Sequence, residues 1–174
     1  MHLPCTVGKN AWMPAVNVRP LDAALWFESL GQLQQEANSR GSRIENRLRQ
    51  SYYLANLAPP PYSAVARCDI GEVEFEALLE SAAFEAAAIA LIGQILSFEV
   101  IRIPLGGEVT ARVWIGEVSG EAQTSSGCAA SALVRAWLTL LLRLREREPV
   151  LNGPEHPRDQ HRSLSEPPRK PILH

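Results

Sequence analysis

Histidine and cysteine side chains carry much of the acid–base, nucleophilic and metal chemistry of proteins, and their placement in this chain limits that chemistry. The histidines all fall near the two ends, at His2, His156, His161 and His174. We expect both ends to lie outside the packed core, so the core has no histidine to act as a base beside a serine or cysteine nucleophile. The sequence therefore predicts no catalytic residues of the Ser-His or Cys-His kind.

The three cysteines, Cys5, Cys68 and Cys128, are an odd number at wide spacing, which matches neither a zinc knuckle nor a redox motif. We expect reduced thiols and a cytoplasmic location.

The sequence contains no Gly-x-Gly-x-x-Gly or Gly-Lys-Ser/Thr loop to bind a phosphate. We therefore expect no metal site and no cofactor. A non-catalytic protein is the favoured interpretation, and an enzyme whose site is built from Glu, Arg and Tyr alone stays open.

Arginines gather in one stretch, and aromatic residues lie close to it. The stretch contains Arg40, Arg43, Arg47 and Arg49, followed by Tyr52 and Tyr53. Arg112 and Trp114 add a second cation and ring on one face of a predicted strand. Because cations bind phosphates and rings stack on bases, these residues define a nucleic-acid-binding alternative. A solvated helix face is the competing interpretation, and the net charge of −2 favours it.

A proline-rich motif forms a second candidate binding feature. Pro59, Pro60 and Tyr62 fit the pattern Pro-Pro-x-Tyr, which resembles the peptides that WW domains bind and the late-domain peptides of viral matrix proteins. A preformed polyproline turn loses little conformational entropy when it docks in an aromatic groove. The motif predicts an adaptor or matrix-like protein as a second alternative, and a rigid linker between two helical parts is the simpler interpretation.

Two helices are expected in the first third of the chain. From Pro20, apolar residues recur at three and four positions over about 17 residues, which is typical of an amphipathic helix that ends near Asn38. Residues 40–57 form a weaker helical stretch. Asp69 and Glu72 have the spacing of a capping box, so we expect a helix to begin there and to continue through Ala82–Leu96, the most apolar run.

The run Ala82–Leu96 is apolar on nearly all sides, so we expect it to pack on two sides or against a second copy of the chain. It is shorter than the ~20 residues that a membrane span needs. After it, Phe98–Pro104 is rich in β-branched residues, Gly106-Gly107 predicts a tight turn, and Val109–Gly116 alternates between apolar and polar residues. These features predict a hairpin at about 98–118.

The last part of the chain is predicted to be a loop, a helix and a tail. Small residues at Ser119–Gly127 predict a loop, and Ser125 or Ser126 is a suitable cap for the final helix. The buried stripe of that helix should contain Ala130, Leu133, Val134, Trp137, Leu141 and Leu144. Pro149 ends it, and the proline-rich residues 149–174 have little to bury, which predicts a disordered tail.

The chain has 174 residues, of which 46% are hydrophobic, so it is long enough for one core of ordinary size. The predicted fold class is α+β, with helices packed on a small antiparallel sheet centred on the 98–118 hairpin. An extended arm at 1–19 precedes a single domain at 20–148. That domain consists of a helical part (20–57), a proline-rich linker (58–68) and a helix-hairpin-helix part (69–148).

The order of helix, two strands and helix between Phe84 and Leu142 also carries a family resemblance. The segments concerned are Phe98–Ile103, Gly106-Gly107, Ala111–Trp114, Gly120–Thr124 and Cys128–Ala132. In this pattern the chain resembles the small phage and prophage domains called ABA sandwiches, whose function is generally unassigned. A Pro-Tyr-Ser loop often leads directly into the first helix of that family, whereas here Pro61-Tyr62-Ser63 lies well before Phe84, and the helices at 20–57 have no counterpart. The resemblance implies a topology and transfers no catalytic residues.

Taken together, these patterns favour a non-catalytic interaction or accessory protein, encoded by a phage or mobile element, that acts through protein–protein contacts. The expected partner is a protein, and a second copy of the chain, bound through residues 82–96, is one candidate. Nucleic-acid binding through the arginines and recognition of the Tyr62 motif by WW domains are the two alternatives.

Overall fold

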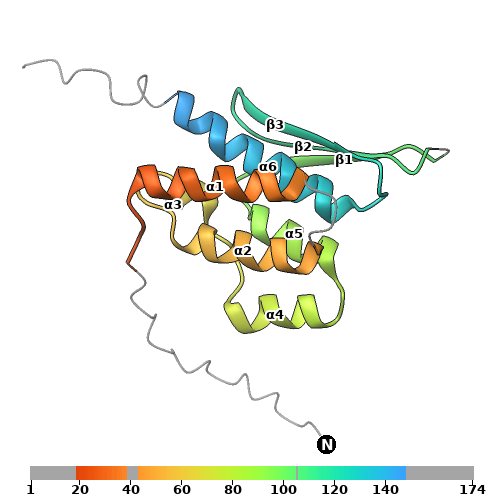
Figure 1. Ribbon diagram of the computed structural model, residues 1–174, viewed down its shortest axis with the longest axis horizontal. Coiled ribbons are helices and arrows are strands. Elements are labelled where there is room, and N and C mark those ends of the chain that lie inside the picture. Colours follow the sequence, from red (N-terminus) through yellow and green to blue (C-terminus); the bar gives the residue numbers. More distant parts are fainter. Residues whose placement is uncertain (1–18, 39–42, 105, 148–174) are drawn as a thin grey trace, which may run out of the picture.

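The computed structural model describes residues 19–38, 43–104 and 106–147. In chain order, its elements are α1 (Ala23–Asn38), α2 (Ile44–Asn56), α3 (Ser63–Ala66), α4 (Glu72–Glu80), α5 (Phe84–Ile92), β1 (Ser97–Arg102), β2 (Val109–Ile115), β3 (Val118–Thr124) and α6 (Ala129–Glu146). The strands form an antiparallel sheet in the order β1-β2-β3 (Figure 1). The predicted α+β class, with helices packed on a small antiparallel sheet, is confirmed. The predicted arm and tail lie almost entirely outside the described residues.

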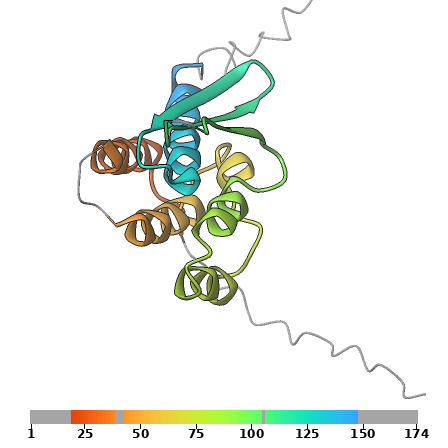
Figure 2. The same ribbon diagram turned by 90° about the vertical axis from the view of Figure 1, so that its right-hand side faces the viewer.

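Helix α6 is the centre of the core. Figure 2 shows it directly beneath the sheet, with the other helices on its far side. It packs on β2 and β3 with one side and on α1 and α5 with another. Because it is covered on several sides, Leu133, Trp137 and Leu141 of the predicted stripe are all fully buried. Burying a side chain of this size contributes about 1.5–3 kcal/mol, so this helix is the main source of packing energy.

The alternation of β2 positions the sheet on that helix. Val109, Ala111 and Val113 are buried, as the pattern predicts, because their side chains face α6. The residues between them, Thr110 and Arg112, face the opposite side of the sheet. No described element covers that side, and we call it the open face.

Strand β3 corrects one prediction, because Ser119–Gly127 is largely a strand and not a loop. Val118–Thr124 pairs with β2 after a two-residue turn in which Gly116 has a φ of 53°, a left-handed conformation that glycine adopts without strain. The small residues reflect close packing and not a loop. A Cβ on Gly120 would lie 2.0 Å from the carbonyl oxygen of Ala136 in α6, so only glycine lets the helix approach this closely.

The single helix expected from Glu72 to Leu96 is two helices, which is a second correction. After α4, Ala82 has a φ of 55°, and the N–H groups of Ala82 and Ala83 donate to the carbonyls of Leu79 and Leu78 at 3.0 and 2.8 Å. This is the Schellman pattern, in which a left-handed residue ends a helix. Glycine usually occupies that position, so a sequence with alanine there gives no stop signal.

The predicted caps are also wrong, by two or three residues. Gly71, and not Asp69, precedes α4, and its N–H donates to the side chain of Glu74 at 3.4 Å. Cys128, and not Ser125 or Ser126, precedes α6. The Ser126 N–H donates instead to the hydroxyl of Thr124 at 3.2 Å, which closes the turn that follows β3.

Residues 20–57 contain α1 and α2, and the segment 58–68 contributes side chains to the core. In the first part, the indole N–H of Trp26 in α1 donates to the Leu54 carbonyl of α2 at 2.8 Å and joins the two helices. The segment that follows contains α3, and it places Ala58, Ala66 and Cys68 in the core. Short apolar side chains among the prolines explain why the segment packs inward.

Candidate functional site

The proline–tyrosine motif is part of the core. Tyr62 is 4% exposed, stacks on Trp26 with ring centroids 5.6 Å apart, and meets Phe27 edge to face at 4.8 Å. Pro59 is buried and Pro60 is exposed. A WW domain has to bind the tyrosine ring in a groove, so the motif is not presented to such a domain in this conformation.

The predicted basic stretch is distributed over different contacts. Arg40 lies outside the described residues, and Arg43 is exposed at the start of α2. Arg47 points inward, where it donates to the Ala37 carbonyl at 3.2 Å and to the Ser131 hydroxyl at 3.1 Å, and burial lowers its pKa. Its guanidinium group therefore ties α1, α2 and α6 together.

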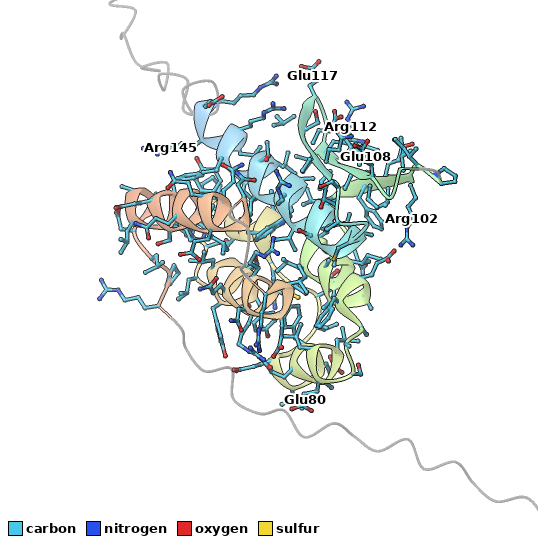
Figure 3. The ribbon with its side chains drawn as sticks, turned by 45° about the vertical axis from the view of Figure 1, so that its right-hand side comes forward. Glu80, Arg102, Glu108, Arg112, Glu117 and Arg145 are labelled. Atoms are coloured by element: carbon cyan, nitrogen blue, oxygen red, sulfur yellow. The ribbon has the colours of Figure 1, made fainter. Side chains whose placement is uncertain are left out.

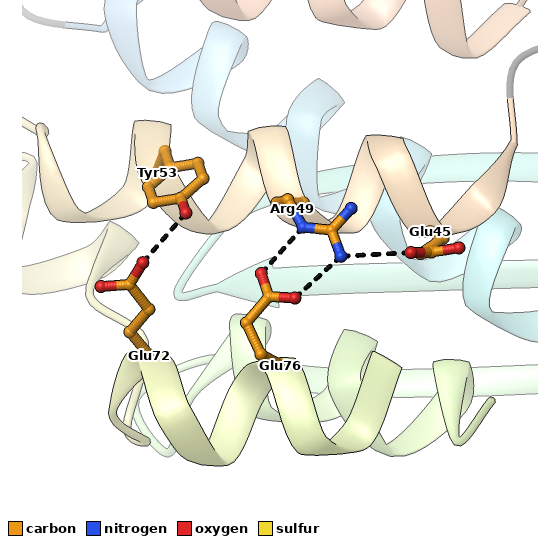
Figure 4. Close-up of polar contacts among 5 residues, drawn as sticks. All are labelled: Glu45, Arg49, Tyr53, Glu72 and Glu76. Atoms are coloured by element: carbon orange, nitrogen blue, oxygen red, sulfur yellow. Dashed lines mark hydrogen bonds and ion pairs between the residues drawn. The ribbon is translucent and has the colours of Figure 1, made fainter. Parts of the chain in front are cut away.

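Arg49 belongs to a polar cluster between α2 and α4 (Figure 4). Its Nε and Nη2 atoms donate to the two carboxylate oxygens of Glu76, each at 2.8 Å, and Nη2 also donates to Glu45 at 3.1 Å. These bonds lower the pKa of Glu76 and raise that of Arg49. One turn along, the Tyr53 hydroxyl donates to Glu72 at 3.0 Å, which raises the pKa of Tyr53. The cluster fastens α4 to α2, and phosphate would have to compete with Glu76 for Arg49.

Arg112 and Trp114 lie on β2, well away from the arginines of α2. Figure 3 shows Arg112 on the sheet, above α6 and apart from the lower helices. The guanidinium carbon of Arg112 is 5.7 Å from the centroid of the Trp114 ring, a cation–π arrangement. The structure therefore does not bring the predicted nucleic-acid residues together on one surface.

On the open face of the sheet, side chains of neighbouring strands lie opposite each other. Register places Arg112 between Glu99 of β1 and Glu121 of β3, and Thr110 opposite Ile101. Together these five residues line a hollow of about 210 Å³. A second hollow of about 290 Å³ lies between α1 and α2. Both fall below the ~300–1,000 Å³ of sites that enclose small molecules.

The two outer edges of the sheet differ. Along β3, the Ser119 carbonyl accepts a hydrogen bond from Arg143 of α6 at 2.6 Å, and the Gln123 carbonyl accepts one from Arg135 at 2.9 Å. Within the described part of the chain, no side chain bonds to the main chain of β1. The N–H and C=O groups on the outer side of β1 are therefore available to another strand.

Exposed apolar side chains are concentrated beside that free edge. They include Ile89 at the end of α5, Ile95 just before β1, Phe98 and Ile101 on β1, and Ile103 just after it. The predicted association segment 82–96 is partly covered by its own chain, since Ala87, Ala88, Leu91, Ile92 and Leu96 are buried. Two of these exposed residues, Ile89 and Ile95, thus lie within the predicted segment, and the other three lie on β1 or just after it.

Reasoning from the sequence did not identify the β1 edge as a site. The alternation in Val109–Ile115 shows which residues of β2 face the core, but β1 has no such alternation, because Phe98, Val100 and Ile101 are all apolar. A strand that is apolar on both faces yet ends at a proline, Pro104, is the signal that could have indicated an edge strand.

The remaining chemistry-bearing residues do not form a second site. The histidines all lie outside the described residues, as does Cys5. Cys68 is buried, which raises the pKa of its thiol, and its Sγ donates to the Ala90 carbonyl at 3.2 Å. Among the described residues, no three histidine, cysteine, aspartate or glutamate side chains are grouped as metal ligands, and no helix is both long and apolar enough to cross a membrane.

No protein-family model matches this chain, and no curated protein or solved structure does so. The resemblance to phage ABA-sandwich domains and the phage or mobile-element origin therefore stay predictions.

Proposed function

We propose that this protein is a non-catalytic accessory protein that acts through protein–protein contacts, and that a second copy of the chain is one of its partners. One observation carries the proposal. Of the eight large apolar side chains that are exposed in the described residues, five lie between Ile89 and Ile103. Exposed apolar residues scattered singly are normal, whereas a cluster of them marks an interaction site.

The arrangement of charge supports a protein partner over nucleic acid. Arg47 and Arg49 are already bound to groups of their own chain, and Arg112 lies between two glutamates in the sheet register. The residues of β1 combine exposed apolar side chains with one acidic and one basic residue, Glu99 and Arg102, so the strand carries no excess of positive charge that would favour nucleic acid.

Sedimentation velocity on the full chain tests this function. Over about a hundredfold range of concentration, which corresponds to about 2.8 kcal/mol of association free energy, the average mass should rise from that of one chain toward that of two. Because the contact is mainly apolar, added salt should leave the rise unchanged, whereas binding to nucleic acid would weaken steeply with salt. A mass of one chain at every concentration would contradict self-association.

A further inference from the structure

We infer that the open face of the sheet is a docking surface for residues 167–173 of the same chain, with two adjacent cations of that segment bound to Glu99 and Glu121. The segment lies outside the described residues, and its residue types and its distance along the chain from α6 identify it as the occupant. The inference concerns a contact within one chain, so it goes beyond the proposed function and does not depend on self-association.

The first argument is that the open face carries two carboxylates without partners. The helices pack on the other side of the sheet (Figure 2). Register places Glu99 of β1 and Glu121 of β3 on either side of Arg112. Within the described part of the chain, neither carboxylate has a hydrogen bond or an ion pair, although each lies only one strand spacing from Arg112. Both negative charges are therefore left for a group that comes from elsewhere.

Arg112 does not neutralise these glutamates because it stacks on Trp114. Its guanidinium carbon is 5.7 Å from the centroid of that ring. Glu108, which accepts a hydrogen bond from Gln123 of the same face, adds a third negative charge. The open face thus has an excess of negative charge, and its hollow of about 210 Å³ is suited to the side chains of a peptide and not to an enclosed small molecule.

The charges of the segment match this face. Arg169 and Lys170 are the one place in the sequence where two basic residues are consecutive. In an extended chain, consecutive side chains point to opposite sides, so a segment lying along β2 directs one cation toward β1 and the other toward β3. Glu99 and Glu121 are two strand spacings apart, about 9.5 Å, which two long basic side chains pointing in opposite directions can reach.

The prolines beside this pair favour a face of the sheet over an edge. Pro168 and Pro171 have no N–H, and a residue that precedes a proline favours an extended backbone. Such a segment cannot complete the hydrogen-bond ladder of an edge strand, whereas binding on a face uses side chains. Ile172 then provides an apolar side chain to pack on Ile101, which is 51% exposed beside the hollow.

The end of α6 places the segment within reach of the open face. Arg147, the last described residue, pairs with Glu117 in the turn between β2 and β3 at 3.7 Å, and Figure 3 shows Glu117 at one end of the sheet. Glu121 is four residues further along β3, about 14 Å away. Residues 148–168 can span up to about 70 Å. A tether of this kind gives the segment an effective concentration on the order of millimolar at the face.

Zero-length crosslinking of the full chain tests this contact, because Lys170 is one of two lysines in the sequence. A carbodiimide joins a lysine amine to a carboxylate that it touches, and mass spectrometry of the digested protein identifies the pair. After correction for the reactivity of each carboxylate with ethanolamine, Lys170 should couple to Glu99 or Glu121 at least about fivefold more often than to Glu80. Glu80 is exposed on α4, far from the sheet (Figure 3). Coupling in proportion to ethanolamine reactivity would overturn the inference.

A pair of charge reversals tests whether the two cations hold the segment on the sheet. Arg169→Glu should abolish the preference of Lys170 for the open face, whereas Arg158→Glu, which lies outside the proline-flanked pair, should keep it. Raising the salt concentration from about 0.1 to 1 M shortens the screening length from about 10 to 3 Å and should also reduce the preference. Circular dichroism confirms that both variants are folded. The same coupling pattern in the two variants would contradict the inference.

Mixing chains of two isotopes shows whether the contact forms within one chain. In an equal mixture of ¹⁴N and ¹⁵N protein, crosslinks from Lys170 to the open face should join residues of the same label. Mixed labels in about half of these crosslinks would mean that the segment comes from another copy, and that result would overturn a contact within the chain. A preference of Lys9, in place of Lys170, for the same glutamates would overturn it as well.

Discussion

Replacing Gly120 with alanine tests the contact that positions the whole sheet. The added Cβ would lie 2.0 Å from the carbonyl oxygen of Ala136 and 2.4 Å from the amide nitrogen of Leu140. These two atoms are four residues apart in α6 and belong to its hydrogen-bond ladder, so neither can rotate away. Because ordinary contacts to a carbon atom begin near 3.5 Å, the helix must retreat from β3 by more than about 1 Å.

The cost should be at the upper end of that for an overfilled core. Such substitutions typically lose about 1–3 kcal/mol, and here the obstruction is main chain on both sides, so we expect about 3 kcal/mol. For a domain of this size, that loss corresponds to a fall in Tm of about 10 °C. It is a large part of the ~5–15 kcal/mol by which such domains are stable.

Urea unfolding followed by circular dichroism measures this loss, and Gly31→Ala is its control. Gly31 lies within α1, and nothing would be within 4 Å of its added Cβ. In a helix, alanine is favoured over glycine by about 1 kcal/mol, so this variant should be stabilised and the two variants should differ by about 4 kcal/mol. If Gly120→Ala unfolds within about 0.5 kcal/mol of the wild-type chain, the approach of α6 to β3 described above is incorrect.

Three further substitutions have defined expectations. Ala82→Gly should raise the free energy of unfolding, measured with urea, by up to about 1 kcal/mol, because it removes the cost of an alanine in the left-handed conformation. A lower free energy of unfolding would contradict the Schellman ending of α4. Trp26→Phe should lower the free energy of unfolding by about 1 kcal/mol more than Trp137→Phe does in the same assay. The indole of Trp26 donates a hydrogen bond, whereas the buried indole N–H of Trp137 has no partner among the described residues. Equal losses for the two variants would contradict this reasoning. Arg49 lowers the pKa of Glu76, so this carboxylate stabilises the fold above its ordinary pKa of 4.5, and that contribution is lost as the pH falls. Glu76→Gln should therefore flatten the decline of Tm on acidification. An unchanged pH profile of Tm would refute the role of the ion pair.

The sequence predicts those parts of the fold that repeat a local pattern. Alternation along Val109–Ile115 identifies the buried face of β2, and apolar spacing identifies the stripe of α6. It does not show that small residues such as Gly120 lie in a strand, because their size is set by a helix that follows later in the chain. The turn at Gly116 and the alternation of Val118, Gly120 and Ala122 are the signals that could have shown it.

The candidate site was less predictable, because it depends on which side chains are used elsewhere. Spacing alone makes Arg47 and Arg49 available for phosphate, yet their partners are far along the chain, at Ser131 and Glu76. In the same way, a run of prolines predicts an exposed peptide, and packing against Trp26 buries Tyr62. Long-range partners of this kind are decided by tertiary structure and leave no local pattern.

The arrangement of α6 explains why one sheet edge is protected and the other is not. This helix has 18 residues and runs along β2 and β3, so its arginines reach the carbonyls of β3. Helix α5, the neighbour of β1, has only 9 residues. An ion pair between Arg102 of β1 and Glu85 of α5 links this helix to the strand. If two copies paired through one such edge each, the dimer would be closed, because among the described residues no further sheet edge without side-chain cover would remain.

Removing the protection of β3 should therefore change the type of assembly. In the double variant Arg135→Ala/Arg143→Ala, each copy has two free edges, so pairing through both produces open chains and not a closed dimer. Sedimentation should then show masses above that of two chains, which increase with concentration, while circular dichroism stays that of the folded wild type. Adding Ile101→Lys to this double variant should reduce the assemblies again. A folded double variant that sediments like the wild type would mean that these arginines do not keep β3 from pairing.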